Sequence, residues 1–337
     1  MSRDATSMIE EAASGYIGAT ILFSAFELGL FDALVNPMSV HTLASKIGAG
    51  AGGVRRLCRV LGAMGLLELR GDLVAPVAGA TEALARGGDA WCVVRHHQRH
   101  VLPLFLHLTD ALRTGERQYR RWSFAETPLG ASAYEELARH PAELGTFLGA
   151  MDRSSRGAGV ALVPLLRERG VRRLVDLGCG GGGVAREILA SMPEIEIESF
   201  DLPAVCAIAR ARCGMEHAGR HFIAPGDLLA GVDARGADAV LLSGILADFD
   251  DGERESILEG ARKNLRPGGH LLLSETLLDE DGAGPMGAAV LSLVMLLAMR
   301  GDQLGAAEIR ALLERSGFVD IQTKRAQPRD IVAARAR

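Results

Sequence analysis

The sequence lacks several features by which common classes of protein are recognised. Its 37 lysines and arginines stand against 42 aspartates and glutamates, and a net charge of -5 argues against DNA or RNA as a partner. Its five cysteines never form a CxxC pair, which indicates reduced thiols, with neither a disulfide framework nor a zinc knuckle. Its longest uncharged apolar run, residues 286–299, has 14 residues, too few to cross a bilayer, and predicts a buried helix. Its polar, acidic first residues are unlike a targeting segment, so we expect a cytoplasmic protein without a membrane partner.

What the sequence does contain is a helical pattern of apolar residues over its first third. The 337 residues predict two domains at about 150 residues each. Residues 40–47 and 54–64 predict two short helices, and residues 66–74 predict a hairpin that turns at Gly71-Asp72. Helix, helix and hairpin in this order are typical of a winged helix, which we assign to residues 1–113.

The winged helix has two interpretations. Its second helix carries Arg55, Arg56 and Arg59, which would suit DNA recognition. The acidic net charge instead favours a packing or dimerisation module whose arginines face solvent.

From residue 170 the pattern changes to alternating strands and helices. This alternation predicts an α/β fold with a Rossmann-like, doubly wound parallel sheet over 170–337, and a tight final turn at 327–329 predicts an antiparallel edge. Residues 114–169 form a helical connector between the two domains. The predicted strands are 174–177, 195–200, 221–223, 239–242, 271–274, 318–324 and 330–334, and the predicted helices are 184–191, 204–212, 253–265 and 306–315.

The strongest motif is the glycine run that follows the first of these strands. Gly178, Gly180 and Gly182 leave bare backbone at the mouth of a helix, where a nucleotide-like ligand can lie. The spacing also satisfies the dinucleotide fingerprint, so NAD(P) is an alternative. Asp176, two residues before the first glycine, and the additional Gly182 favour S-adenosyl-L-methionine.

Polar residues after the next strands support the same ligand. Asp201 ends the second strand, where its carboxylate can bind both ribose hydroxyls. Asp227 follows the third strand and can bind the adenine edge, while Leu228 packs on the adenine face. We also place Leu202 and Ser243 in this cofactor site.

Together these motifs resemble the S-adenosylmethionine-dependent small-molecule methyltransferases of the plant and bacterial O-methyltransferase family. The resemblance covers nearly the whole chain. It implies a homodimer formed through the first domain, a cofactor held by the second domain, and methyl transfer to a small metabolite, by default at oxygen. The motifs that carry it are AFELGLFDAL at 25–34, VDLGCGGGG at 175–183, FDLP at 200–203, GDLL at 226–229, DFDD at 248–251, LRPGG at 265–269 and SGF at 316–318.

The sequence departs from this family where the family keeps its catalytic base. The resemblance implies a histidine that deprotonates the acceptor, but Ala247 stands there, and Gln303 replaces the supporting glutamate. Glu275 still provides a carboxylate after the fifth strand and is a catalytic candidate. C- or N-methylation is therefore plausible. A non-methylating enzyme that uses the bound sulfonium and a winged-helix ligand-sensing regulator are the alternatives.

A histidine-rich segment offers substitutes for the missing base. His97 and His100 are our catalytic candidates, and His96 and His107 are candidates for the substrate pocket. A two-histidine metal site completed by a carboxylate is a further possibility, but we predict no resident metal. Further candidate substrate contacts, besides Ala247 and Gln303, are Trp122, Met151 and Met295.

Overall fold

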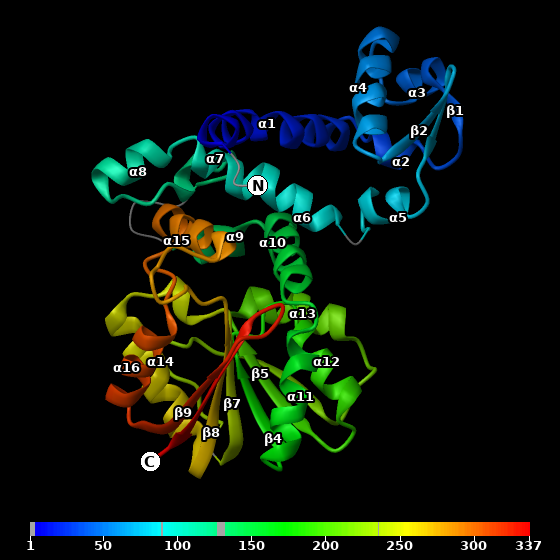
Figure 1. Ribbon diagram of the computed structural model, residues 1–337. Helices are drawn as coiled ribbons and strands as arrows, with labels where there is room; N and C mark the ends of the chain where they lie inside the picture. Colours follow the sequence, from blue (N-terminus) through cyan, green and yellow to red (C-terminus); the bar gives the residue numbers. More distant parts are fainter. Residues whose placement is uncertain (1–3, 89, 127–131, 235) are drawn as a thin grey trace. The chain divides into compact units, whose positions relative to one another are not determined.

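The computed structural model describes residues 4–88, 90–126, 132–234 and 236–337 of the chain (Figure 1). The chain divides into two compact units, Met1–Gln98 and Arg99–Arg337. In the described part, no helix has both the length and the apolar character that a membrane span requires.

The first unit is built mainly from helices around one apolar core. Its long first helix begins after Asp4, whose carboxylate accepts a hydrogen bond from the Thr6 N–H at 3.2 Å. The core is centred on Phe31, Leu43 and Leu61, each at most 2% exposed. The helices are α1 (Ala5–Glu27), α2 (Leu30–Ala33), α3 (Val40–Lys46), α4 (Ala51–Ala63), α5 (Ala80–Leu84) and α6 (Trp91–His96).

A small sheet of order β1-β3-β2 completes the winged-helix arrangement. β2 (Leu67–Arg70) and β3 (Leu73–Pro76) are antiparallel and joined by the turn at Gly71-Asp72, where Gly71 has φ +62°. The predicted helices and hairpin are therefore confirmed. The two-residue strand β1 (Met38–Ser39) was not predicted, because so short a strand leaves no period in the sequence.

The second unit is organised around a seven-stranded sheet of order β6-β5-β4-β7-β8-β10-β9. The first five strands in this order run parallel, and β10 is antiparallel to both β8 and β9. The predicted parallel sheet and antiparallel edge are confirmed. The strands are β4 (Arg173–Leu177), β5 (Glu196–Asp201), β6 (His221–Pro225), β7 (Ala237–Ser243), β8 (Leu265–Glu275), β9 (Phe318–Lys324) and β10 (Asp330–Ala336).

Helices cover both faces of this sheet, as Figure 1 shows. Val240 and Leu242 of β7 belong to the core beneath α14 and α16, whereas Leu241 belongs to the core beneath α11 and α12. The alternation follows from the strand period of two, which sends successive side chains to opposite faces. The helices are α11 (Ala158–Glu168), α12 (Gly183–Ser191), α13 (Pro203–Cys213), α14 (Asp251–Asn264) and α16 (Ala306–Arg315).

Residues 266–269, within the LRPGG motif, form a bulge inside β8. Ala237 pairs with Leu265 and Ala239 pairs with His270. An advance of two residues along β7 therefore corresponds to an advance of five residues along β8. Gly268 has φ +72° in this bulge. The β8 strand therefore begins earlier than the sequence indicated.

The other helices of the second unit surround a separate cluster around Trp122, whose ring stacks on Phe124 at 5.3 Å between centroids. Leu297 of α15 is fully buried in this cluster, but Met286 of the same helix is 78% exposed. The prediction of a buried helix therefore holds for one face only, because a helix packed on one side buries one stripe. The elements here are α7 (Leu102–Phe105), α8 (Leu108–Thr114), η2 (Tyr119–Arg121), α9 (Ala133–Arg139), α10 (Pro141–Ser154) and α15 (Met286–Ala298), preceded by the π-helical turn η1 (His97–Val101).

Candidate functional site

The glycine loop joins β4 to α12 at the C-terminal edge of the parallel strands. Gly178, Gly180 and Gly182 have φ of +82°, +55° and +80°, in the left-handed region that favours glycine. A Cβ atom added to Gly178 would lie 2.3 Å from Ile245 Cδ1, and one added to Gly182 would lie 2.7 Å from Cys213 Sγ. Side chains are therefore excluded at Gly178 and Gly182 on both conformational and steric grounds, and at Gly180 on conformational grounds. The loop leaves backbone for a ligand at the start of a helix.

Two carboxylates, the buried Asp176 and the half-buried Asp201, lie beside this loop. Asp201 accepts hydrogen bonds from the Gly180 N–H at 2.8 Å and the Leu202 N–H at 2.7 Å. Burial raises the pKa of Asp201 to about 6, against the lowering effect of these two donors. Asp176, 2% exposed, accepts from the Ser199 hydroxyl at 3.3 Å, and burial raises its pKa to about 7. Within the described residues neither carboxylate forms an ion pair, so a positively charged ligand is favoured here.

The residues predicted at the adenine follow the neighbouring strands. Leu228 Cδ1 lies 3.6 Å from the point that a Cβ of Gly178 would occupy, so this side chain reaches the glycine loop. Asp227 is exposed, and its Oδ1 accepts from the Leu229 N–H at 2.9 Å. Ser243 ends β7, and its hydroxyl accepts from Arg329 Nη1 at 3.2 Å. The glycine loop, its two neighbouring aspartates and Leu228 fit an adenosyl sulfonium at the carboxyl ends of the strands.

Arg329 is a further candidate residue that the sequence did not reveal, because it follows the last predicted helix and lies in a turn before the final strand. A Cβ added to Gly244 would lie 2.5 Å from its Nη1, so the glycine at φ +67° makes room for the guanidinium. Burial raises the pKa of both Asp248 and Glu275, and the Arg329 charge opposes part of this rise. Arg329 thus brings a cation to the end of β7.

Ala247 lies in the short turn η3 (Leu246–Asp248), where its methyl group offers no proton acceptor. Glu275, 3% exposed at the end of β8, fixes this turn, because its Oε1 accepts from the Ile245 N–H at 2.9 Å and the Leu246 N–H at 3.2 Å. Burial raises the pKa of Glu275. The glutamate therefore holds the backbone next to Ala247.

Two further polar side chains tie η3 and its surroundings together. Arg254, 4% exposed on α14, donates from Nε to the Leu246 carbonyl at 2.8 Å and from Nη2 to the Asp302 carbonyl at 2.7 Å. Gln303, 6% exposed, donates from Nε2 to the Thr276 carbonyl. Gln303 therefore acts here as a structural tether between two loops.

A pair of residues that sequence reasoning did not join lies beside Ala247. Tyr134 of α9 donates its hydroxyl hydrogen to Asp248 Oδ2, across 114 residues of chain. Burial, together with the charge of Asp248, raises the pKa of Tyr134 well above its usual value. Burial also raises the pKa of Asp248 to about 7. The sequence contains Asp248 in the DFDD motif and Tyr134 in the connector, but only the tertiary structure pairs them.

The histidine candidates occupy different surroundings. His100 is 2% exposed, and its Nε2 lies 3.1 Å from Glu143 Oε2 within the aromatic cluster. His107 lies on the same unit with its Nδ1 3.2 Å from Asp110 Oδ2. His96 and His97 belong to the first unit, with ring centroids 5.8 Å apart.

The apolar substrate-contact candidates and the possible metal site remain to be placed. Trp122 is buried in its aromatic cluster, and its Nε1 donates to the His100 carbonyl at 2.8 Å. Met295 is 7% exposed on α15, and Met151 is half-buried on α10. Over the part of the chain that the structure describes, no group of three or more His, Cys, Asp and Glu side chains is arranged to hold a metal ion.

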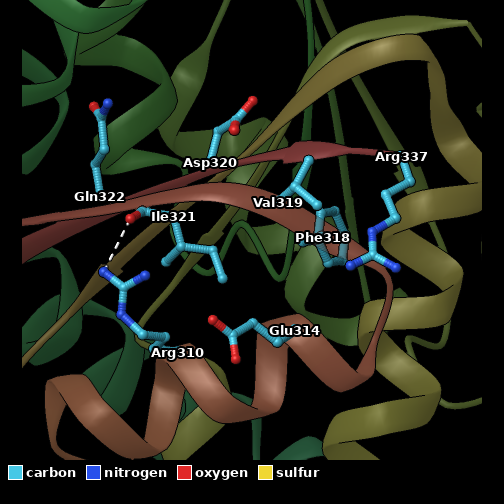
Figure 2. A pocket seen from close by; sticks show the side chains of 8 residues that line it. All are labelled: Arg310, Glu314, Phe318, Val319, Asp320, Ile321, Gln322 and Arg337. Carbon is cyan, nitrogen blue, oxygen red and sulfur yellow. Dashed lines mark hydrogen bonds between the residues drawn. The ribbon is translucent and has the colours of Figure 1, made fainter.

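One pocket lies away from all of these residues. Figure 2 shows it between α16 and the edge strand β9, lined by Arg310, Glu314, Asp320 and Arg337 among others. Three strands, β7, β8 and β10, separate β9 from the glycine-loop strand β4. None of the predicted site residues lines this pocket, so we place the site at the glycine loop.

Comparison with known proteins gives a consistent result over both units. The family model described as the O-methyltransferase domain matches residues 105–319, and that of the O-methyltransferase dimerisation domain matches residues 10–82. Acetylserotonin O-methyltransferase of Gallus gallus is 29% identical over 332 residues, covering 96% of this chain and 94% of its own. The 3-hydroxy-5-methyl-1-naphthoate 3-O-methyltransferase of Streptomyces sahachiroi is 32% identical over 329 residues, covering 94% and 91%. The crystal structure of human N-acetylserotonin methyltransferase in complex with S-adenosylmethionine superimposes with a TM-score of 0.87 at 27% identity over 99% of each chain.

Proposed function

This chain belongs to the O-methyltransferase family, and we propose that it methylates a hydroxyl oxygen of a small aromatic metabolite. Its cofactor is S-adenosylmethionine, as in the human structural neighbour. The observation that carries the proposal is the glycine loop with Asp176 and Asp201 beside it, two carboxylates that form no ion pair among the described residues. The relatives named for acetylserotonin and for a hydroxynaphthoate support an aromatic acceptor.

Specific residues would hold the cofactor. Asp201 would take the ribose hydroxyls with the oxygen lone pairs that its two backbone donors leave open. Leu228 would pack on the adenine and Asp227 would accept from its edge, while Leu202 and Ser243 would complete the wall. The bound cofactor supplies a methyl group activated by a sulfonium.

The rest of the site would orient the acceptor. Displacement at a methyl carbon requires the attacking oxygen in line with the bond that breaks, and such orientation is worth several kcal/mol. We assign the acceptor to the space around Ala247, with Met151 and Met295 as apolar contacts.

We also propose that the protein is a homodimer through its first unit, because the dimerisation-domain model matches residues 10–82. Several large apolar side chains on the exposed surface of α1 support this assembly, since soluble proteins rarely leave such groups clustered. They are Met8, Ile9, Tyr16 and Ile17, between 46% and 69% exposed.

Ligand binding and product analysis test the proposed function. Calorimetric titration should show that S-adenosylhomocysteine binds and that a nicotinamide dinucleotide does not. Incubation with S-adenosylmethionine and a panel of phenols should give a product heavier by one methylene group, with S-adenosylhomocysteine formed in equal amount. Preference for the dinucleotide, or turnover without methyl transfer, would reject the proposal.

A further inference from the structure

The structure leaves the proton of the acceptor hydroxyl without an obvious destination. Ala247 has no titratable atom, and Gln303 is neutral and donates to the Thr276 carbonyl. The charged and titratable groups that meet around η3 come from separate elements. They are Asp248 on η3 itself, Tyr134 on α9, Glu275 on β8, Arg254 on α14 and Arg329 before β10.

We propose that Asp248 accepts the proton of the hydroxyl that becomes methylated, and that Tyr134 positions the Asp248 carboxylate for this step. The proposal rests on the proposed function, since it assumes methyl transfer to oxygen. It assigns the role of general base to Asp248, the residue after Ala247, in place of the missing histidine.

The hydrogen bonds around Asp248 leave one of its oxygens open. Its Oδ2 accepts from the Tyr134 hydroxyl, and across the described residues its Oδ1 has no hydrogen-bond partner. The side chain is half-buried, so the open oxygen has access to a ligand without being fully in water. One oxygen is thus fixed in direction while the other remains an acceptor.

Tyr134 is itself held firmly. Ser132 and Glu135 form a capping box that fixes the start of α9, and the Tyr134 ring meets Phe147 edge-on at 6.1 Å between centroids. The charges of Asp201 and Glu275 both raise the pKa of Tyr134. The Tyr134–Asp248 pair is therefore within electrostatic reach of Asp201, the proposed ribose ligand, and of Glu275, which holds the η3 turn.

The other groups of the cluster are less suited to accept a proton. Glu275 is 3% exposed and its Oε1 is committed to two backbone N–H groups. Tyr134 stays protonated at neutral pH, because burial raises its pKa well above the usual value. Burial, with a contribution from the Glu275 charge, raises the pKa of Asp248 to about 7 against the lowering effects of Tyr134, Arg329 and Arg254. A base works best when its pKa is near the working pH.

The step balances without any further reactant. The hydroxyl O–H bond breaks and its proton moves to Asp248 Oδ1. The oxygen electron pair forms the bond to the methyl carbon as the carbon–sulfur bond breaks and its electron pair stays on sulfur. The protonated Asp248 then returns its proton to water.

The test uses the full-length protein with 3-hydroxy-1-naphthoate, N-acetylserotonin and a set of simple phenols as acceptors. Asp248→Asn keeps the shape and the hydrogen bond from Tyr134 but removes the base. We expect its kcat to fall by about a hundredfold or more, with S-adenosylhomocysteine affinity and thermal unfolding close to wild type. Asp281→Asn, the same change at an exposed turn residue, is the matched control and should keep wild-type kcat.

A pH profile separates a base from a merely structural residue. Wild-type kcat should rise with pH through about 7 and then level off, because only the ionised Asp248 can accept a proton. Tyr134→Phe removes a donor that lowers the pKa of Asp248, so its rising limb should move to higher pH. Asp248→Glu should recover part of the activity that Asp248→Asn loses.

Several outcomes would overturn the assignment. Unchanged kcat in Asp248→Asn is one, and loss of the rising limb in Glu275→Gln with its retention in Asp248→Asn is another. Wild-type protein that binds S-adenosylhomocysteine but methylates only carbon or nitrogen would also overturn it, since no hydroxyl proton is then removed. Failure to bind S-adenosylhomocysteine at all would instead be a failure of the proposed function, which the titration detects separately.

Discussion

At the scale of single residues, the candidate site is distinguished by buried or half-buried carboxyl groups that form no ion pair within the described part of the chain. Asp176 and Asp201 lie beside the glycine loop, and burial raises the pKa of both. A buried acid without a partner is costly in the free protein and gains most when a positive ligand binds. Changes at these two residues should therefore alter ligand affinity and the pH dependence of stability.

Replacement of Asp201 by alanine should weaken cofactor binding while leaving the fold intact. A charged hydrogen-bond acceptor contributes about 1.5–3 kcal/mol, so we expect S-adenosylhomocysteine affinity to fall by about tenfold to a hundredfold in calorimetric titration. The exposed Asp281→Ala is the control for a lost aspartate elsewhere. Unchanged affinity in Asp201→Ala would remove the ribose assignment.

The raised pKa of Asp176 predicts how the stability of the ligand-free protein depends on pH. The unfolded chain loses the Asp176 proton near pH 4, whereas the folded protein keeps it up to about pH 7. The stabilising contribution is therefore complete below the unfolded pKa and is lost as the pH rises through the folded pKa. Asp176→Asn should reduce the fall in unfolding free energy between pH 5 and 7 by up to about 1.4 kcal/mol per pH unit. Urea unfolding at several pH values measures this, and parallel curves for both proteins would contradict it.

At the scale of elements, the turn η3 depends on side chains from two other elements. Glu275 of β8 binds two of the N–H groups that precede Ala247, and Arg254 of α14 binds the Leu246 carbonyl. The position of Asp248 therefore follows from β8 and α14 and not from the turn alone.

Loss of Arg254 should destabilise this region. Arg254→Met leaves the Leu246 and Asp302 carbonyls without their charged donor, and we expect a loss of about 2–4 kcal/mol in the free energy of unfolding. Arg70→Met serves as the control, because Arg70 is 83% exposed in its ion pair with Glu68 and should change stability by less than about 0.5 kcal/mol. Similar unfolding midpoints for the two variants would show that Arg254 does not support η3.

At the scale of the whole molecule, the first unit carries the proposed association. Ile9 and Tyr16 lie seven residues apart on α1, hence on one face of the helix, and both are more than 60% exposed. A second copy of the chain would bury them.

The double variant Ile9→Glu with Tyr16→Glu should shift the protein from dimer to monomer in analytical ultracentrifugation. Charged side chains on this face would have to be buried without partners in the dimer. Ser14→Glu places the same charge on a different face of α1 and should leave the dimer intact. A wild-type protein that sediments as a monomer would refute the assembly.

The sequence alone determined the order of elements and predicted a candidate cofactor site. Strand and helix periods predicted the winged helix and the parallel sheet, since those periods depend only on neighbouring residues. The sequence could place the glycine run, Asp201 and Leu228 together because the C-terminal ends of parallel strands meet at one edge, whatever the details of packing.

What only the tertiary structure decided was the chemistry around Ala247. Tyr134 and Asp248 are 114 residues apart, and Arg329 follows the last helix, so no local pattern connects them. The insertion of β10 between β8 and β9 likewise depends on pairing across the sheet. Hydrogen bonds, burial and pKa values depend on which residues are neighbours in space. The order of residues along the chain does not specify those neighbours.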